Sequence, residues 1–144
     1  MLSKSVRLDI FLKSRDFLAD IEMQVRNDSD NPLNLRSRFY QSKIDNWNLD
    51  KGYDYKNLLQ SYIIFISPFD PFESNLACYT FKNICLEDKT IELNDKTTKI
   101  FLYTKGNTQG LDKDIVDFLN YCNTNIPNSD FINTIDLEVN QIKK

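Results

Sequence analysis

Histidine is absent from the 144 residues of the sequence. This absence excludes Ser-His-Asp and Cys-His catalysis, because both need an imidazole as general base. It also excludes zinc bound by histidine, an HNH-type general base and a two-histidine transposase site. The chemistry that remains is carboxylate with Mg²⁺ or Mn²⁺, together with Lys, Arg, Gln and Tyr side chains.

Cysteine, glycine and proline are scarce. Cys78, Cys85 and Cys122 are odd in number, lie far apart and form no CxxC motif, so we expect reduced thiols in a cytoplasmic protein. Three glycines and four prolines argue against a loop-dominated fold, and a hydrophobic content of 41% argues against disorder.

No apolar run approaches the ~20 residues of a membrane span, and no secretory signal follows the first residue. The length favours a single domain over residues 1–144.

Two segments near the start of the chain alternate between aliphatic and mostly polar residues. Residues 6–12 and 18–26 both have the period of two that is typical of a half-buried strand. The link from Ser14 to Phe17 is short enough for a hairpin. The pattern therefore predicts two adjacent antiparallel strands, each with one polar face.

The register of this hairpin follows from its turn. If Ser14 faces Phe17, Asp9 lies opposite Glu22, and the next polar pair along the strands is Arg7 with Gln24. Opposed residues on one face have Cβ atoms roughly 4.5–5.5 Å apart. Two carboxylates at that separation repel each other unless a cation, a proton or a basic group lies between them. The sequence therefore predicts a site for a divalent cation, although a solvated hairpin face with incidental charges remains the alternative.

Seven segments of the chain carry a resemblance to a known family. They are Arg7-Leu8-Asp9-Ile10, Asp20-Ile21-Glu22-Met23-Gln24, Arg36-Ser37-Arg38-Phe39-Tyr40-Gln41-Ser42, Tyr62-Ile63-Ile64-Phe65-Ile66, Phe69-Asp70-Pro71-Phe72, Tyr79-Thr80-Phe81 and Thr97-Thr98-Lys99-Ile100-Phe101-Leu102. In this order and spacing, from about Ser5 to about Asn123, the sequence resembles the PD-(D/E)XK nuclease family transposases, also called recombination-promoting nucleases.

The resemblance implies an α/β fold with a mixed β-sheet flanked by helices. It implies that Asp9 and Glu22 bind the metal, Mg²⁺ or Mn²⁺, and that Gln24 completes the catalytic set at a position where many PD-(D/E)XK nucleases have Lys. Family members usually carry a helical region and another strand before the Asp motif. Because this motif begins within ten residues of Met1, the sequence resembles a shortened member that lacks the N-terminal helix.

The function implied by the resemblance is that of a metal-dependent DNA endonuclease of the transposase or recombination-promoting type, a mobile-element hydrolase of phosphodiester bonds. Nucleases of this kind often act as dimers on duplex DNA, so a homodimer is a candidate assembly. The alternative is a catalytically inactive remnant that binds DNA or another protein. The sequence does not decide between an active endonuclease and an inactive remnant.

The charge distribution bears on DNA binding. The net charge of −3 is not typical of a dedicated nucleic-acid-binding protein, but residues 1–43 hold eight Lys and Arg against six Asp and Glu, a local charge of +2. Ordinary surface charge is the alternative explanation, and Tyr40 could equally be a core residue. The candidates for contact with nucleic acid are Arg7, Arg26, Arg36, Arg38, Tyr40 and Gln41.

The remaining chain is predicted to form the scaffold. A helix is expected from Leu33 to about Leu49, with Arg36 and Gln41 off its apolar stripe. That stripe is formed by Leu35, Phe39, Tyr40, Ile44 and Trp47. The apolar run from Ser61 to Ser67 is predicted to be the central, doubly buried strand.

Further elements follow this central strand. Asp70 is interpreted as a turn former rather than a metal ligand. Two strands are expected at Leu76–Cys85 and Ile91–Leu102, and a helix at Leu111–Asn123. The tail 126–144 has a weak helical period and is expected to pack on the domain or to mediate self-association.

Overall fold

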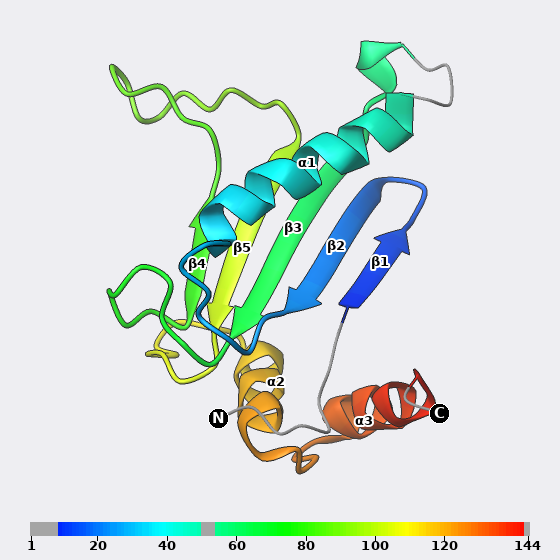
Figure 1. The fold of residues 1–144 in the computed structure, drawn as a ribbon, viewed down its shortest axis with the longest axis vertical. Coiled ribbons are helices and arrows are strands. Elements are labelled where there is room, and N and C mark those ends of the chain that lie inside the picture. The colour runs from blue at the N-terminus through cyan, green and yellow to red at the C-terminus, as the bar shows by residue number, and fades with distance from the viewer. Residues whose placement is uncertain (1–8, 50–53, 143–144) are drawn as a thin grey trace.

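The computed structural model describes residues 9–49 and 54–142, which form a mixed five-stranded sheet with helices on both faces (Figure 1). The predicted α/β class is therefore confirmed. The elements in chain order are β1 (Asp9–Lys13), β2 (Phe17–Met23), α1 (Leu33–Leu49), the 3₁₀ turn η1 (Tyr55–Asn57), β3 (Gln60–Ser67), β4 (Cys78–Phe81), β5 (Thr97–Tyr103), α2 (Lys113–Thr124) and α3 (Asp130–Ile142). No helix in the described part of the chain has the length and apolar character needed to cross a bilayer.

The strands lie in the order β1-β2-β3-β5-β4. Strands β1 and β2 form an antiparallel hairpin, and α1 then crosses over the sheet so that β3 runs parallel to β2. Strand β5 continues the parallel part beside β3, and β4 pairs antiparallel at the far edge. The apolar run of β3 therefore occupies the centre of the sheet, as its composition predicts.

The hairpin has the register that the sequence predicts. Asp9 pairs with Glu22, and Lys13 pairs with Leu18. Ser14 closes the turn, because its backbone N–H donates to the Phe17 carbonyl oxygen at 2.9 Å and its Oγ accepts from the Phe17 N–H at 3.1 Å. The predicted start of the first strand lies outside the described residues.

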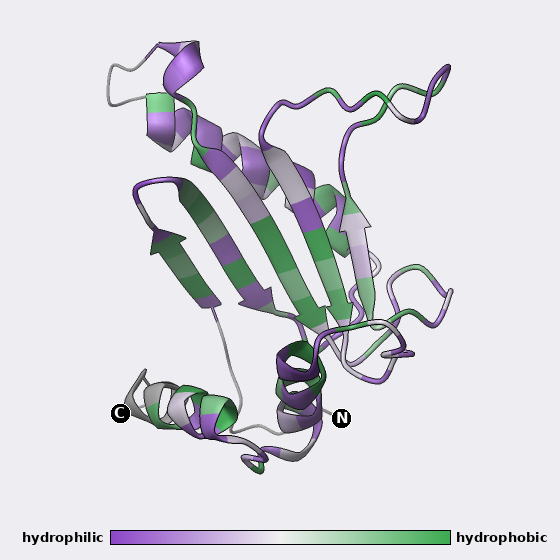
Figure 2. Ribbon diagram, turned by 180° about the vertical axis from the view of Figure 1, so that it is seen from behind, coloured by the Kyte–Doolittle hydropathy of each residue, from purple (hydrophilic) through white to green (hydrophobic). Residues whose placement is uncertain are grey.

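Helix α1 covers one face of the sheet. Phe65 of β3 and Phe101 of β5 stack on that face with their ring centroids 5.8 Å apart, and Leu33 and Ile44 of α1 are buried in the same cluster. Helices α2 and α3 pack at the other face, where Ile66 belongs to the second cluster. Figure 2 shows this second face from behind, with hydrophobic residues along the central strands.

The orientation of α1 differs in part from the prediction. Tyr40, Ile44 and Trp47 of the expected stripe do pack against the core. Leu35 and Phe39, expected on the buried stripe, are 58% and 60% exposed, whereas Ser37 is buried against the sheet. The Ser37 hydroxyl donates to the Asn34 carbonyl oxygen at 2.6 Å, which satisfies it inside the interface. The helix is thus rotated from the expected position, and Arg36 faces the sheet instead of lying off the contact.

The second half of the chain has shorter strands than predicted. β4 covers only the inner part of its expected range. β5 begins six residues later than expected, at Thr97, and ends at Tyr103. Asn94 and Lys96 adopt positive φ angles of 57° and 61° in the turn before β5. Asp70 forms a turn as interpreted, because its carboxylate accepts backbone hydrogen bonds from Phe72, Glu73 and Asn75. Helix α3 packs on the domain, where Ile132 is fully buried.

Candidate active site

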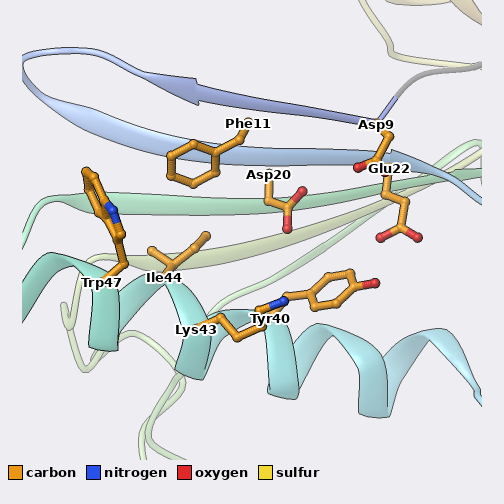
Figure 3. A pocket seen from close by; sticks show the side chains of 8 residues that line it. All are labelled: Asp9, Phe11, Asp20, Glu22, Tyr40, Lys43, Ile44 and Trp47. Carbon is orange, nitrogen blue, oxygen red and sulfur yellow. The ribbon is translucent and has the colours of Figure 1, made fainter.

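The candidate site lies between the β1–β2 hairpin and α1. Asp9 and Glu22 pair across the two strands and both line a cleft of about 530 Å³, which we call the α1 cleft (Figure 3). The residues around it are Asp9, Phe11, Asp20, Glu22, Tyr40, Lys43, Ile44 and Trp47. Cross-strand neighbours on one face have Cβ atoms roughly 4.5–5.5 Å apart, so the two carboxylates can approach a shared cation.

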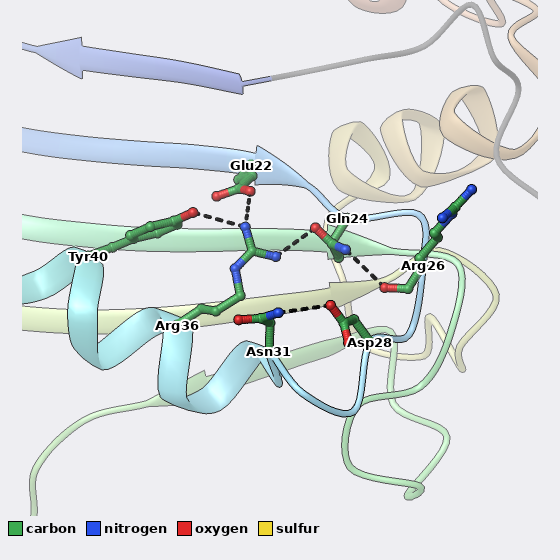
Figure 4. Close-up of polar contacts among 7 residues, drawn as sticks. All are labelled: Glu22, Gln24, Arg26, Asp28, Asn31, Arg36 and Tyr40. Carbon is green, nitrogen blue, oxygen red and sulfur yellow. Dashed lines mark hydrogen bonds and ion pairs between the residues drawn. The ribbon is translucent and has the colours of Figure 1, made fainter.

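Arg36 connects the site to α1 (Figure 4). Its Nη2 atom forms an ion pair with Glu22 Oε1, and its Nη1 atom donates to Gln24 Oε1 at 2.6 Å. The guanidinium also donates to the Tyr40 hydroxyl at 2.9 Å. One arginine therefore holds the acid and the amide of the Glu-x-Gln motif, together with a tyrosine one helical turn away.

Tyr40 belongs both to the core and to the site. Its ring stacks on Phe65 at a centroid distance of 5.8 Å, while its hydroxyl reaches Arg36. Burial raises the pKa of the Tyr40 hydroxyl above its ordinary value, and contact with Glu22 raises it further, against the opposing effect of Arg36. Tyr40 is thus a neutral hydrogen-bonding group near neutral pH.

Asp20 is a site residue to which the sequence reasoning gave no role. It lies two residues before Glu22 on β2, opposite Phe11, and lines the α1 cleft. Burial raises the pKa of its carboxyl group, and the charges of Glu22 and Asp9 raise it further, while Lys43 opposes them. The role of Asp20 could have been predicted from the sequence, because side chains two residues apart on a strand, such as Asp20 and Glu22, lie on the same face of the sheet.

The donor set suits a magnesium-type cation. Within residues 9–49 and 54–142, no three His, Cys, Asp or Glu side chains converge closely enough to form a complete metal cluster. Mg²⁺ commonly takes only one or two carboxylates and completes its shell with water and substrate phosphate oxygens. The opposed Asp9 and Glu22 provide such a pair of hard oxygen donors on one side of an open cleft.

The other predicted nucleic-acid contacts are dispersed. Arg7 lies outside the described residues, and Arg26 is exposed, with its backbone carbonyl oxygen accepting from Gln24 Nε2 at 3.0 Å. Arg38 lies on the outer side of α1 in a shallow pocket that it shares with Phe39. Gln41 is turned inward, where its Nε2 donates to Ser61 Oγ at 2.8 Å, so it connects α1 to β3.

Comparison with known proteins agrees with this geometry. The family model of the PD-(D/E)XK nuclease family transposases matches residues 1–121 of the 144. Searches among curated proteins and among solved structures found no match. The matched range contains the opposed acids, the Glu-x-Gln strand, the crossover helix and the central strands. The chain therefore belongs to the PD-(D/E)XK nuclease family transposases.

Proposed function

We propose that this protein is a metal-dependent DNA endonuclease of the transposase type that hydrolyses phosphodiester bonds. The observation that carries the proposal is the pairing of Asp9 with Glu22 on the face of the sheet that lines the α1 cleft. The family resemblance implies that these two residues are the metal-binding acids. We place the activity in the cytoplasm, as the three free cysteines favour, and with a homodimer as the candidate assembly.

In this proposal Asp9 and Glu22 hold the cation, Mg²⁺ or Mn²⁺. When bound there, such a cation lowers the pKa of a water molecule and neutralises charge on the phosphate that is attacked. The two carboxylates also repel a phosphate that arrives without a cation. The DNA is therefore positioned by groups around the acids rather than by the acids themselves.

Many PD-(D/E)XK nucleases have a lysine where this chain has Gln24. In this proposal Gln24 and Arg36 together take over the role of that lysine. The Gln24 amide can orient a water molecule or a phosphate oxygen, but it carries no positive charge. Arg36, at 2.6 Å from Gln24 Oε1, supplies that charge from α1. A guanidinium binds phosphate oxygens through paired N–H groups, which suits it to stabilise the charge that develops on the phosphate.

The proposal is tested by cleavage of supercoiled plasmid in Mg²⁺ or Mn²⁺. The wild type should nick or linearise the plasmid, and Asp9→Ala and Glu22→Ala should each abolish cleavage. Asp16→Ala is the matched control, because Asp16 is an exposed acid in the turn of the same hairpin, and it should keep full activity. Equal cleavage by the wild type and both site variants would remove the assignment.

A second candidate is a non-catalytic domain that binds DNA or another protein. The ion pair between Arg36 and Glu22 favours it, since a carboxylate that is already neutralised has less need of a metal. Calorimetric titration with Mn²⁺ separates the two candidates. Heat of binding that disappears in Asp9→Ala and Glu22→Ala supports the nuclease, and its absence in the wild type supports the non-catalytic domain.

A further inference from the structure

The α1 cleft has two chemically different ends. The Asp9–Glu22 pair lies at one end, and the next pair along the same strands, Phe11 opposite Asp20, leads to the other. There Phe11 meets Trp47 of α1 edge-on, with ring centroids 5.9 Å apart and an interplanar angle of 74°. Figure 3 shows Phe11 and Trp47 at one end of the cleft and Asp9 and Glu22 at the other, beside the Tyr40 ring, with Asp20 between the two ends.

At the aromatic end Phe11 stays partly exposed, whereas Trp47 packs against the core cluster beneath α1. Phe11 is 49% exposed although it contacts Trp47, so a ring surface remains available to a planar ligand. The proposed nuclease chemistry at Asp9 and Glu22 leaves this end without a role. Its volume is part of the same 530 Å³, a size typical of small-ligand pockets.

Basic side chains border the cleft. At the aromatic end, Lys13 of β1 places its Nζ 4.9 Å from the centroid of the Trp47 ring. Lys43 of α1 also lines the cleft, and its Nζ lies 5.8 Å from the centroid of the Tyr40 ring, towards the acids. These two lysines come from opposite walls. A DNA strand whose backbone follows the rim would meet a positive charge on each side.

The charge inside the cleft decides which part of the DNA could enter. Asp20 lies on the floor of the cleft between the two ends, opposite Phe11, where a phosphate would be repelled. A nucleobase is uncharged, stacks on aromatic rings, and can donate a hydrogen bond from an exocyclic amino group to a carboxylate. The combination of aromatic wall, acidic floor and basic rim therefore fits a base with its backbone outside.

We infer that the aromatic end of the α1 cleft is a subsite for an unpaired nucleobase, stacked on Phe11 and hydrogen-bonded through an amino group to Asp20. The inference rests on the proposed function, because it names the DNA that the same cleft takes: DNA with an unpaired or extruded nucleotide beside the phosphate to be cut. Phe11 and Asp20 act as specificity-determining residues in this arrangement. Cytosine, adenine and guanine offer the amino group, and thymine does not.

The test measures binding separately from cleavage. Fluorescence anisotropy in EDTA and at fixed salt compares three labelled duplexes that carry, at one position, an unpaired cytosine, an unpaired thymine or an abasic site. We expect the wild type to bind the cytosine duplex about 5- to 150-fold more tightly than the abasic duplex, as stacking on an aromatic side chain implies. The thymine duplex should bind with intermediate affinity.

Variants assign the preference to the subsite. Phe11→Ala should bind the cytosine and abasic duplexes equally, and Phe11→Tyr should keep the preference because it keeps the ring. Phe131→Ala is the matched control, since Phe131 is 47% exposed on α3 at the other face of the molecule, and it should behave as wild type. Circular dichroism verifies that each variant is folded.

Two results would overturn the inference: equal affinity of the wild type for the cytosine and abasic duplexes, or an undiminished preference in folded Phe11→Ala. The outcome is separable from that of the proposed function. If plasmid cleavage depends on Asp9 but the cytosine and abasic duplexes bind equally, the nuclease assignment stands and the nucleobase subsite is wrong. If the cytosine duplex binds more tightly but the plasmid is not cleaved, the subsite stands and the nuclease assignment is wrong.

Discussion

Arg36→Ala is the perturbation that probes the site most informatively, because Arg36 joins α1 to the Glu-x-Gln strand. The side chains of Arg36 and Glu22 are only 21% and 16% exposed, so the substitution leaves a largely desolvated carboxylate without its counter-charge. Hydrogen bonds to charged groups contribute about 1.5–3 kcal/mol, and breaking a fully buried ion pair costs about 3–5 kcal/mol. Since water still reaches this pair, we expect a loss of about 2 kcal/mol in the free energy of unfolding.

Urea denaturation in EDTA and in Mn²⁺ measures this loss. In Arg36→Ala the Glu22 carboxylate no longer pairs with a guanidinium and is free to bind Mn²⁺. A ligand that binds the native state stabilises it by mass action, so Mn²⁺ should raise the free energy of unfolding of Arg36→Ala more than that of the wild type. Lys113→Ala is the control, since Lys113 is 79% exposed in its ion pair with Asp117 on α2 and its loss should change stability less. If Arg36→Ala were as stable as Lys113→Ala, with no larger response to Mn²⁺, the role given to Arg36 would be wrong.

Three further predictions concern charge, packing and reactivity. The raised pKa of Asp20 means that the native state holds its proton more tightly than the unfolded chain does. Asp20→Asn should therefore raise the free energy of unfolding at pH 7 and lose that gain as the pH falls towards 3.8, in urea titrations at several pH values. Leu119→Ala, at a fully buried position of α2, should cost about 2–5 kcal/mol by thermal melting, whereas Leu137→Ala, at a side chain that is 64% exposed, should cost little. Burial raises the pKa of the Cys122 thiol to about 12, so iodoacetamide should modify it only after denaturation, while the two other cysteines react in the native protein.

The hairpin was predictable because its information is local. A strict period of two fixes which residues share a face, and a short turn fixes the register, so the pairing of Asp9 with Glu22 follows from the sequence alone. The bounds of α1 and the central position of β3 were also predictable. The turn residues Asp28-Ser29-Asp30-Asn31-Pro32 precede the helix, and β3 is an apolar run typical of a doubly buried strand. Both features are visible without knowledge of tertiary contacts.

The face of α1 was not predictable in the same way. Leu35 and Phe39 look like core residues, yet they remain exposed, while the small Ser37 is buried against the sheet. The hydrophobic pattern of this helix is weak, and a tertiary contact that satisfies polar groups, such as the bond from Gln41 to Ser61, outweighs it. The position of Arg36 in the site depends on that rotation.

The outer strands illustrate a second limit. The range Leu76–Cys85 has suitable residues for a strand, but only Cys78–Phe81 pairs with β5. Beyond Phe81 the chain leaves the sheet and forms an isolated bridge between Ile84 and Glu92. Strand propensity reflects packing against neighbours, and beyond Phe81, where the pairing with β5 stops, the same residue types form an irregular segment.

Isothermal titration calorimetry with Mn²⁺ tests the central claim most directly, because it asks whether one cation joins β1 to β2 through their carboxylates. We predict a single binding event in the wild type that is retained in Asp16→Ala and lost in both Asp9→Ala and Glu22→Ala. Binding that survives either of these two substitutions unchanged would contradict it.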